Sequence, residues 1–142
     1  MQLGVREALS EAQIDRLVEL YAYEWWTRDR SRKAVVAMLA GSDVTLALVD
    51  EAGELIAFAR ALTDGVFKAM IFDVIVAPAH RGGGTGDHLM HRMLEHPRLR
   101  QVRHKELYCL PEMVPFYARQ GFSTDNGGVV LMRQAGAPPK GA

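Results

Sequence analysis

The segment 72–94 constrains the fold of this chain more than any other. It begins with an apolar, β-branched run that stops before Pro78, continues through a glycine-rich stretch at 81–86, and ends in a run with helical spacing. Proline lacks the N–H that a sheet ladder needs, so Pro78 marks the end of a strand. The order predicts a strand, a tight loop and a helix whose free N-terminal amides face the loop.

This loop has the properties of an anion site. Glycines adopt positive φ and allow a close approach to the backbone, and the positive end of the helix dipole lies behind them. Arg81 adds a permanent cation at the loop entrance. A flexible surface turn is the alternative, but the position between a strand and a helix favours a phosphorylated ligand. The dinucleotide fingerprint fails because Asp87 replaces its third glycine, and no Walker lysine follows.

The pattern that matches is Arg-x-x-Gly-x-Gly, formed by Arg81, Gly84 and Gly86 after a Val-x-Pro strand end. It resembles motif A of the GCN5-related N-acetyltransferase (GNAT) superfamily, which binds acetyl-coenzyme A. Residues 107–122, ending in Phe-Tyr-x-x-x-Gly-Phe, are similar to motif B of the same family. Both motifs occur in the family's order and separation, and they cover about the second half of the chain.

The resemblance implies an α/β fold with a mixed, mostly antiparallel central sheet flanked by helices. The sequence shows the same order of elements, with Ser10 and Gln13 forming a capping box and Ser31 opening a second helix. Strands are expected at 3–7, 44–49, 55–62, 67–76 and 105–110, a helix at about 111–120, and a closing strand or pair at 123–132. We expect one domain over 1–135 and a frayed tail over 136–142.

In that fold, the strand that ends at Val76 and the strand from Lys105 splay apart, and the pantetheine arm pairs with the backbone of the first. The resemblance therefore assigns cofactor binding to Tyr117 and to a strand and loop set: Val74, Ile75, Val76, Arg81, Gly82, Gly83, Gly84, Thr85, Gly86 and Asp87. A backbone amide near Ile75 or Val76 is the expected oxyanion donor. Asp87 and His88 depart from the family pattern, and Asp87 would repel a diphosphate unless its side chain turns outward.

Acetyl transfer from a thioester to an amine requires a neutral amine, a stabilised oxyanion and a proton for the leaving thiolate. Tyr117 matches the family's general acid, and a phenol of ordinary pKa, about 10, is protonated at neutral pH. Core packing is the alternative role for this tyrosine. Asp73 is the first candidate for the general base, although an exposed strand aspartate without a role fits the sequence equally. Other candidates are Glu24, His80 and Glu112, and a base is dispensable if the amine is bound through water.

The acceptor wall in this family usually comes from the first two helices, which here carry Tyr21, Trp25 and Trp26. These aromatics could stack on an aryl or cationic amine, or belong to a core or an interface. We expect acetyl transfer to a primary amine of a small molecule. An arylalkylamine is a candidate, because 67–74 resembles a bacterial and plastid subgroup that includes serotonin-type enzymes. A protein or peptide N-acetyltransferase is an alternative. Leu110, where many relatives carry a polar residue, also leaves open a non-catalytic coenzyme A sensor.

Composition restricts the partners. Seventeen basic and seventeen acidic residues cancel, which gives no support to nucleic-acid or membrane-surface binding. No metal-ligand cluster occurs, and the single Cys109 is expected to be a buried structural thiol. The start of the chain lacks the apolar core of a signal peptide, so we expect a cytoplasmic protein. A homodimer through Trp25, Trp26 and the closing strands is also expected.

Overall fold

A five-stranded mixed sheet forms the centre of the computed structural model, which describes residues 2–136. Its strands lie in chain order: β1 (Gly4–Arg6), β2 (Val44–Val49), β3 (Leu55–Thr63), β4 (Lys68–Val76) and β5 (His104–Glu106). Neighbouring strands are antiparallel except β4 and β5, which are parallel. The predicted α/β class with a mostly antiparallel sheet is confirmed.

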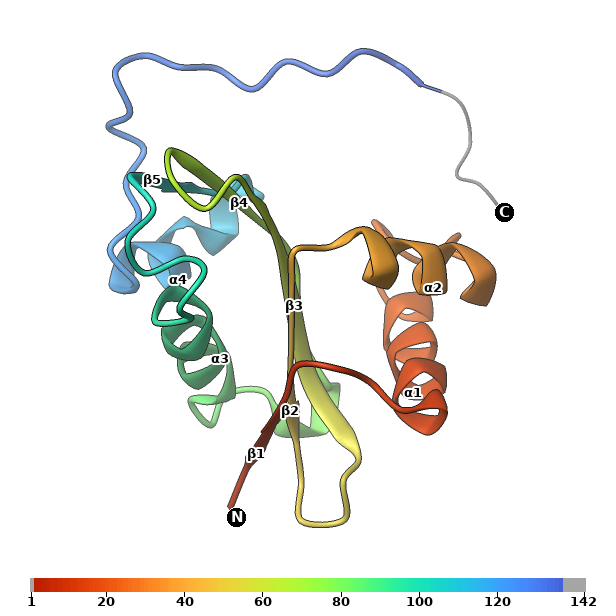
Figure 1. Cartoon of the computed structure of the whole chain (residues 1–142). Coiled ribbons are helices and arrows are strands. Elements are labelled where there is room, and N and C mark those ends of the chain that lie inside the picture. Colours follow the sequence, from red (N-terminus) through yellow and green to blue (C-terminus); the bar gives the residue numbers. More distant parts are fainter. Residues whose placement is uncertain (1, 137–142) are drawn as a thin grey trace.

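Helices cover both faces of the sheet. Figure 1 shows α1 (Glu11–Ala22) and α2 (Arg32–Gly41) on one side, and α3 (Thr85–Leu94) and α4 (Val114–Arg119) on the other. Short 3₁₀ turns, Pro78–His80 and Pro111–Met113, precede α3 and α4. None of the helices in the described residues is long and apolar enough to cross a membrane.

Local sequence signals set the starts of the first two helices. The Ser10 hydroxyl accepts a hydrogen bond from the Gln13 N–H at 3.2 Å, and the Gln13 side chain accepts one from the Ser10 N–H at 2.9 Å. Ser31 accepts from the Ala34 N–H at 3.1 Å. Each cap satisfies amide donors that the helix itself leaves free, so both predicted starts are confirmed.

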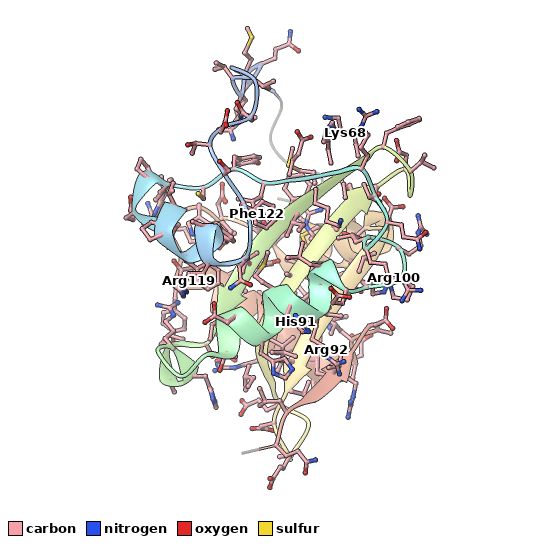
Figure 2. All side chains as sticks on the ribbon, turned by 90° about the vertical axis from the view of Figure 1, so that its left-hand side faces the viewer. Lys68, His91, Arg92, Arg100, Arg119 and Phe122 are labelled. Carbon is pink, nitrogen blue, oxygen red and sulfur yellow. The ribbon has the colours of Figure 1, made fainter. Side chains whose placement is uncertain are left out.

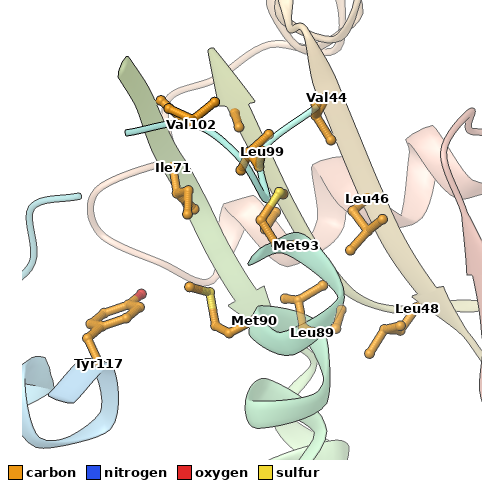
Figure 3. Close-up of a cluster of buried hydrophobic side chains, with 14 of the residues drawn as sticks. Val44, Leu46, Leu48, Ile71, Leu89, Met90, Met93, Leu99, Val102 and Tyr117 are labelled. Carbon is orange, nitrogen blue, oxygen red and sulfur yellow. The ribbon is translucent and has the colours of Figure 1, made fainter. Parts of the chain in front are cut away.

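Alternation along the strands divides the core into two layers. Phe58 and Ile75 face α1 and α2, where they pack with Leu17 and Tyr21. The opposite layer packs strand residues against α3, as Figure 3 shows; it includes Leu46, Leu48, Ile71, Leu89, Met90 and Met93. In Figure 2, α3 crosses this face of the sheet with His91 and Arg92 on its outer side and α4 beside it.

A bulge interrupts the pairing of β3 with β4. Phe58 lies opposite Ile75 and Arg60 lies opposite Phe72, so two steps along β3 match three steps along β4. Asp73 sits at the extra position with a φ of 58°. Aspartate tolerates this left-handed conformation better than most residues. The bulge therefore places an acidic residue out of the regular ladder.

The C-terminal part departs from the sequence predictions. β5 is shorter than the predicted strand at 105–110, and no strand forms between residue 123 and residue 136. A strand is stable only when its backbone groups are paired, and residues 123–136 form no ladder with any strand of the described sheet. Cys109 is exposed, contrary to the predicted buried thiol. Residues 137–142 of the predicted tail lie outside the described residues.

Candidate functional site

The edge of β4 is open beside β5. The two strands pair only between Lys68–Met70 and His104–Glu106, while β4 continues to Val76. From residue 71 onward, β4 therefore has no strand partner on this side among the described residues. Backbone N–H and C=O groups along a free edge can pair with an extended ligand that carries amides. The predicted splay between these strands is present.

The loop after β4 presents backbone amides. Gly82 and Gly84 have φ values of 80° and 84°, and Gly84 caps α3 without a side-chain hydrogen bond. Within the described chain, none of the N–H groups of residues 82–87 donates a hydrogen bond. Free amides at the start of a helix bind an anion through the backbone and the helix dipole. The loop therefore fits a diphosphate.

Asp87 does not oppose this anion site in the way its charge suggests. Its Oδ1 accepts hydrogen bonds from Arg119, at 3.4 Å, and from the side-chain amide of Gln120. The carboxylate thus points to α4, where a guanidinium partly compensates its charge. The Asp87 side chain therefore has the outward orientation that a diphosphate in this loop would require.

Arg81 is engaged by two partners. Its Nε donates to the Val76 carbonyl at 3.0 Å, and its terminal nitrogen pairs with Glu24 at 2.7 Å. The guanidinium therefore ties the end of β4 to the segment after α1, in place of projecting freely at the loop entrance. Glu24, one of the alternative candidates for the general base, is therefore engaged in an ion pair with Arg81.

The end of β4, the start of α3 and the beginning of α4 meet at Gly86. A Cβ at this position would lie 3.1 Å from the Phe116 ring and 3.8 Å from a Val76 methyl carbon. No larger residue fits there without displacing the ring. Gly86 thus allows the anion loop, the open β4 edge and the aromatic pair of α4 to lie together.

Tyr117 follows Phe116 at this junction. Its ring contacts Phe116 and Phe122 edge to face, with centroids 4.9 and 6.1 Å away, and its side chain is almost fully buried. In Figure 3, Tyr117 extends from α4 toward the sheet, near Met90. Burial, with a smaller effect of Cys109, raises the pKa of Tyr117 to about 12. The expected ordinary phenol pKa is therefore wrong, and the hydroxyl keeps its proton at neutral pH more firmly than expected.

An open cavity of about 990 Å³ lies beside Tyr117. β5, Cys109 and α4 form part of its wall, and residues of the 123–132 segment form another part. Although Cys109 is exposed, partial desolvation of its thiol, followed by the charge of Glu112, raises its pKa. A thiol held in its protonated form is a weak nucleophile, so Cys109 is a poor attacking group.

Asp73 lies in a buried ionic cluster on the α1–α2 side of the sheet. Its carboxylate accepts two hydrogen bonds from Arg30, at 2.8 and 3.2 Å, and one from Arg60 at 2.7 Å. The Tyr21 hydroxyl donates to it at 3.4 Å. Only 6% of the Asp73 side chain is exposed. Asp73 is therefore not the exposed strand aspartate without a role that the sequence left open.

The electrostatics of this cluster argue against a base role for Asp73. Burial alone would raise its pKa, but the hydrogen bonds and charges of Arg30 and Arg60 outweigh burial and hold the pKa below its usual range. A carboxylate with a lowered pKa is a weak proton acceptor. Asp73 has the properties of a fixed anion that holds two arginines and the β4 bulge in place.

The predicted acceptor aromatics separate in the structure. Tyr21 is completely buried, and its ring packs edge to face on Phe58. Trp25 and Trp26 lie in the turns after α1 with 65% and 37% of their surface exposed. Of the three, Tyr21 alone makes a hydrogen bond to the Asp73 cluster within the described residues.

Comparisons with known proteins agree with this arrangement. The family model described as "Acetyltransferase (GNAT) family" matches residues 6–122. The chain belongs to the GNAT family. This match extends from β1 to Phe122, so it includes the open β4 edge, the glycine loop and the α4 aromatics, and it confirms the family predicted from the two motifs.

Named GNAT relatives are similar over most of the chain. "GCN5-related N-acetyltransferase 1, chloroplastic" of Arabidopsis thaliana is 30% identical over 88% of this chain and 64% of that protein. "Serotonin N-acetyltransferase 2, chloroplastic" of Oryza sativa subsp. japonica is 33% identical over 86% of this chain and 62% of that protein. The chain thus spans somewhat less than two thirds of the length of these relatives.

Solved GNAT structures share the fold. A crystal structure from Xanthomonas campestris pv. campestris, of a protein described as belonging to the family, aligns with a TM-score of 0.82 and 28% identity. The alignment covers 95% of this chain and 94% of that one. The mixed sheet flanked by helices is therefore the GNAT fold.

Sequence reasoning missed Arg30 and Arg60 in this GNAT chain. Arg60 is a lone charged residue in the apolar run 55–62, and Asp73 is likewise alone in 71–76. Two opposite charges in neighbouring strands, each within an apolar run, indicate a buried ion pair because neither is stable there alone. Arg30 carried no such signal, since it lies in a charged segment at 28–33.

Proposed function

We propose that this protein transfers an acetyl group from acetyl-coenzyme A to a primary amine of a small molecule. The convergence at Gly86 carries the proposal, because it joins the amide-rich loop, the open edge of β4 and the buried phenol of α4. These three features match the three parts of such a donor: a diphosphate, a chain with amides and a thioester.

The residues divide the work as follows. The N–H groups of residues 82–87 bind phosphate oxygens, and the free edge of β4 orients the extended part of the ligand. The acetyl-coenzyme A donor supplies the activated acetyl group when it is bound. Tyr117 donates its proton to the leaving sulfur, which its raised pKa permits at any physiological pH. The oxyanion donor near Ile75 or Val76 stays a prediction.

No protein base is required in this scheme. Two arginines hold the pKa of Asp73 below its usual range, which makes it a poor proton acceptor, and Glu24 is engaged in an ion pair with Arg81. The amine would lose its proton to water or arrive neutral. An arylalkylamine is the first acceptor to test, and the similarity to a protein named serotonin N-acetyltransferase supports this choice.

A coupled experiment tests binding and turnover. Calorimetry should detect coenzyme A binding, and release of free thiol from acetyl-coenzyme A should depend on an added amine. The panel should contain serotonin, phenethylamine, a polyamine, free amino acids and peptides with a free N-terminus or lysine. Turnover of peptides alone would indicate a protein or peptide N-acetyltransferase. Binding without turnover of any amine would indicate a sensor, and absence of coenzyme A binding would overturn the proposal.

A further inference from the structure

The ionic cluster around Asp73 contains two guanidinium groups and one carboxylate. Arg30 and Arg60 both pair with Asp73, and their side chains are only 25% and 15% exposed. The further partner of Asp73 is the Tyr21 hydroxyl, whose pKa is raised by burial, so it adds no negative charge. The cluster therefore carries one net positive charge. A largely buried cation without a counterion is costly, which favours an anionic ligand at this place.

The neighbouring acidic residue does not cancel this charge. Asp29 precedes Arg30 in the sequence, but it is exposed and forms no ion pair with either arginine within the described residues. Water and salt screen an exposed carboxylate, so its effect on a buried guanidinium is small. The excess positive charge of the cluster therefore remains.

Arg60 leaves the forked end of its guanidinium open. Arg30 donates to Asp73 with both terminal nitrogens, whereas Arg60 donates only through Nε, at 2.7 Å. In the part of the chain that the structure describes, no group accepts a hydrogen bond from either Nη atom of Arg60, and neither Nη is sealed from solvent. The two parallel N–H groups at the end of a guanidinium match the two oxygens of a carboxylate.

An aromatic surface adjoins this open end. The guanidinium carbon of Arg60 lies 4.7 Å from the centroid of the Phe72 ring. Phe72 in turn contacts Tyr108 edge to face, with centroids 6.1 Å apart, and 49% of Tyr108 is exposed. Phe72 belongs to β4 and Tyr108 to the segment after β5, so the two rings lie where these strands separate. An aromatic ring of a ligand can pack against such a surface.

The cluster also lies beside the expected reaction centre. Asp73 directly precedes residues 74–76, whose edge has no strand partner in the described sheet. The oxyanion donor predicted near Ile75 or Val76 is two or three residues further, roughly 7–10 Å at about 3.3 Å per residue. Figure 1 shows α1 and α2 on the face opposite α3 and α4. A ligand at the cluster and Tyr117 of α4 therefore approach the end of β4 from opposite faces.

We propose that the acceptor amine also carries a carboxylate, that the open end of Arg60 binds this carboxylate, and that the acceptor is therefore an amino acid. This inference rests on the proposed acetyl transfer and narrows its acceptor from primary amines in general to amines with a carboxylate. In the transfer, the amine nitrogen bonds to the acetyl carbon as the bond from that carbon to sulfur breaks. Tyr117 gives its proton to the sulfur, and the nitrogen loses one to water.

Matched substrates provide the first test, and the aromatic surface guides their choice. Tryptophan and tryptamine differ only in the carboxylate, as do phenylalanine and phenethylamine. We expect kcat/KM, measured by release of free thiol from acetyl-coenzyme A, to be higher for the amino acid of each pair. Higher values for both amines that lack a carboxylate would overturn the inference and leave the acetyltransferase function in place.

Variants of Arg60 isolate the contact with the carboxylate. In Arg60→Met, the ratio of kcat/KM for tryptophan to kcat/KM for tryptamine should fall by roughly 10- to 100-fold, because a charge-assisted contact is lost. A structural defect lowers both rates, and the different basicity of the two amines is the same in every variant, so neither changes this ratio. Arg60→Lys keeps the charge without the fork and should give an intermediate ratio.

Arg32→Met is the matched control for this series. Arg32 is a half-exposed arginine of α2 that pairs with Glu11 and Asp15, outside the cluster, and its loss should keep the wild-type ratio. Circular dichroism checks that each variant folds. An unchanged ratio in Arg60→Met, or an equal fall in Arg32→Met, would overturn the inference.

A binding experiment gives an answer that does not depend on turnover. Indole-3-acetate has the carboxylate but no amine, and indole-3-acetamide is its neutral counterpart. With coenzyme A present to occupy the glycine loop, calorimetry should show at least roughly tenfold tighter binding of the acetate, and Arg60→Met should abolish this difference. Equal affinities, or no detectable binding of either compound, would overturn the inference even if an amine is acetylated. Absence of thiol release with every amine would instead contradict the proposed function.

Discussion

At the scale of single residues, Tyr117 gives the sharpest test of chemistry. Tyr117→Phe keeps the ring between Phe116 and Phe122 but removes the proton donor. We expect kcat to fall by roughly 10²- to 10⁴-fold, as for a lost general acid, with little change in KM for acetyl-coenzyme A. Steady-state kinetics with a good amine measure both. An unchanged kcat would assign Tyr117 to packing alone.

The raised pKa of Tyr117 makes a second prediction about the wild-type rate. Because burial raises that pKa to about 12, ionisation of the phenol should not lower kcat at moderately alkaline pH. The rate should rise with pH as the amine is deprotonated, and the decline due to the phenol should begin only near the raised pKa. A pH profile of kcat with a stable amine measures this, and a decline near pH 10, the ordinary value for a phenol, would contradict it.

Asp73 is predicted to act on stability. Asp73→Asn tolerates the left-handed backbone but leaves Arg30 and Arg60 without their anion, so the free energy of unfolding should fall by about 3 kcal/mol. Urea denaturation at neutral pH measures the loss. Asp15→Asn is a matched control, because its exposed pair with Arg32 should contribute little.

The same residue predicts acid sensitivity. The pKa of Asp73 is lower in the folded chain than in the unfolded chain, so its stabilisation is complete above the unfolded pKa of about 4 and is lost as pH falls through the lower folded value. The wild-type protein should lose more stability than Asp73→Asn when pH is lowered from neutral into this range. If the free energy of unfolding falls with pH equally in the two proteins, Asp73 does not contribute to the acid sensitivity.

At the scale of elements, two glycine substitutions separate the effect of backbone strain from the effect of the glycine's position in the cofactor loop. Gly84→Val places a β-branched residue at a φ of 84° beside the free amides, and coenzyme A binding should be abolished. Gly65→Val introduces the same strain at a φ of 79° in the β3–β4 turn and should keep binding. Calorimetry on both variants distinguishes the cofactor loop from a general loss of stability.

The elements that sequence predicted well are those set by nearby residues. The caps at Ser10 and Ser31 act within three residues, and the strand–loop–helix order follows from Pro78 and the glycines. The Asp73–Arg30 contact joins residues 43 positions apart, so no local pattern reports it. Likewise, the length of β5 and the absence of a strand over residues 123–136 depend on what lies beside these segments, which composition does not specify.

At the scale of the whole molecule, two buried phenols predict sensitivity to alkali. Burial is the main reason that the pKa values of Tyr21 and Tyr117 are raised in the folded chain. Their contribution to stability is complete below the unfolded value of about 10 and is lost as pH rises toward the folded values. Urea denaturation between neutral pH and pH 11 should show a falling free energy of unfolding, and Tyr117→Phe should reduce the slope.

The bulge at Asp73 also affects how this chain is aligned with others. Without Asp73, the neighbours Ile71, Phe72, Val74 and Ile75 would alternate between the two faces without interruption, so the extra residue behaves as an insertion in an otherwise regular strand. A homologous sequence with an unbroken strand therefore requires a one-residue gap at Asp73. A gap placed after Val76 would match every residue from Val74 to Val76 with one on the opposite face of the sheet, and it would assign the residues of the cofactor edge to the core.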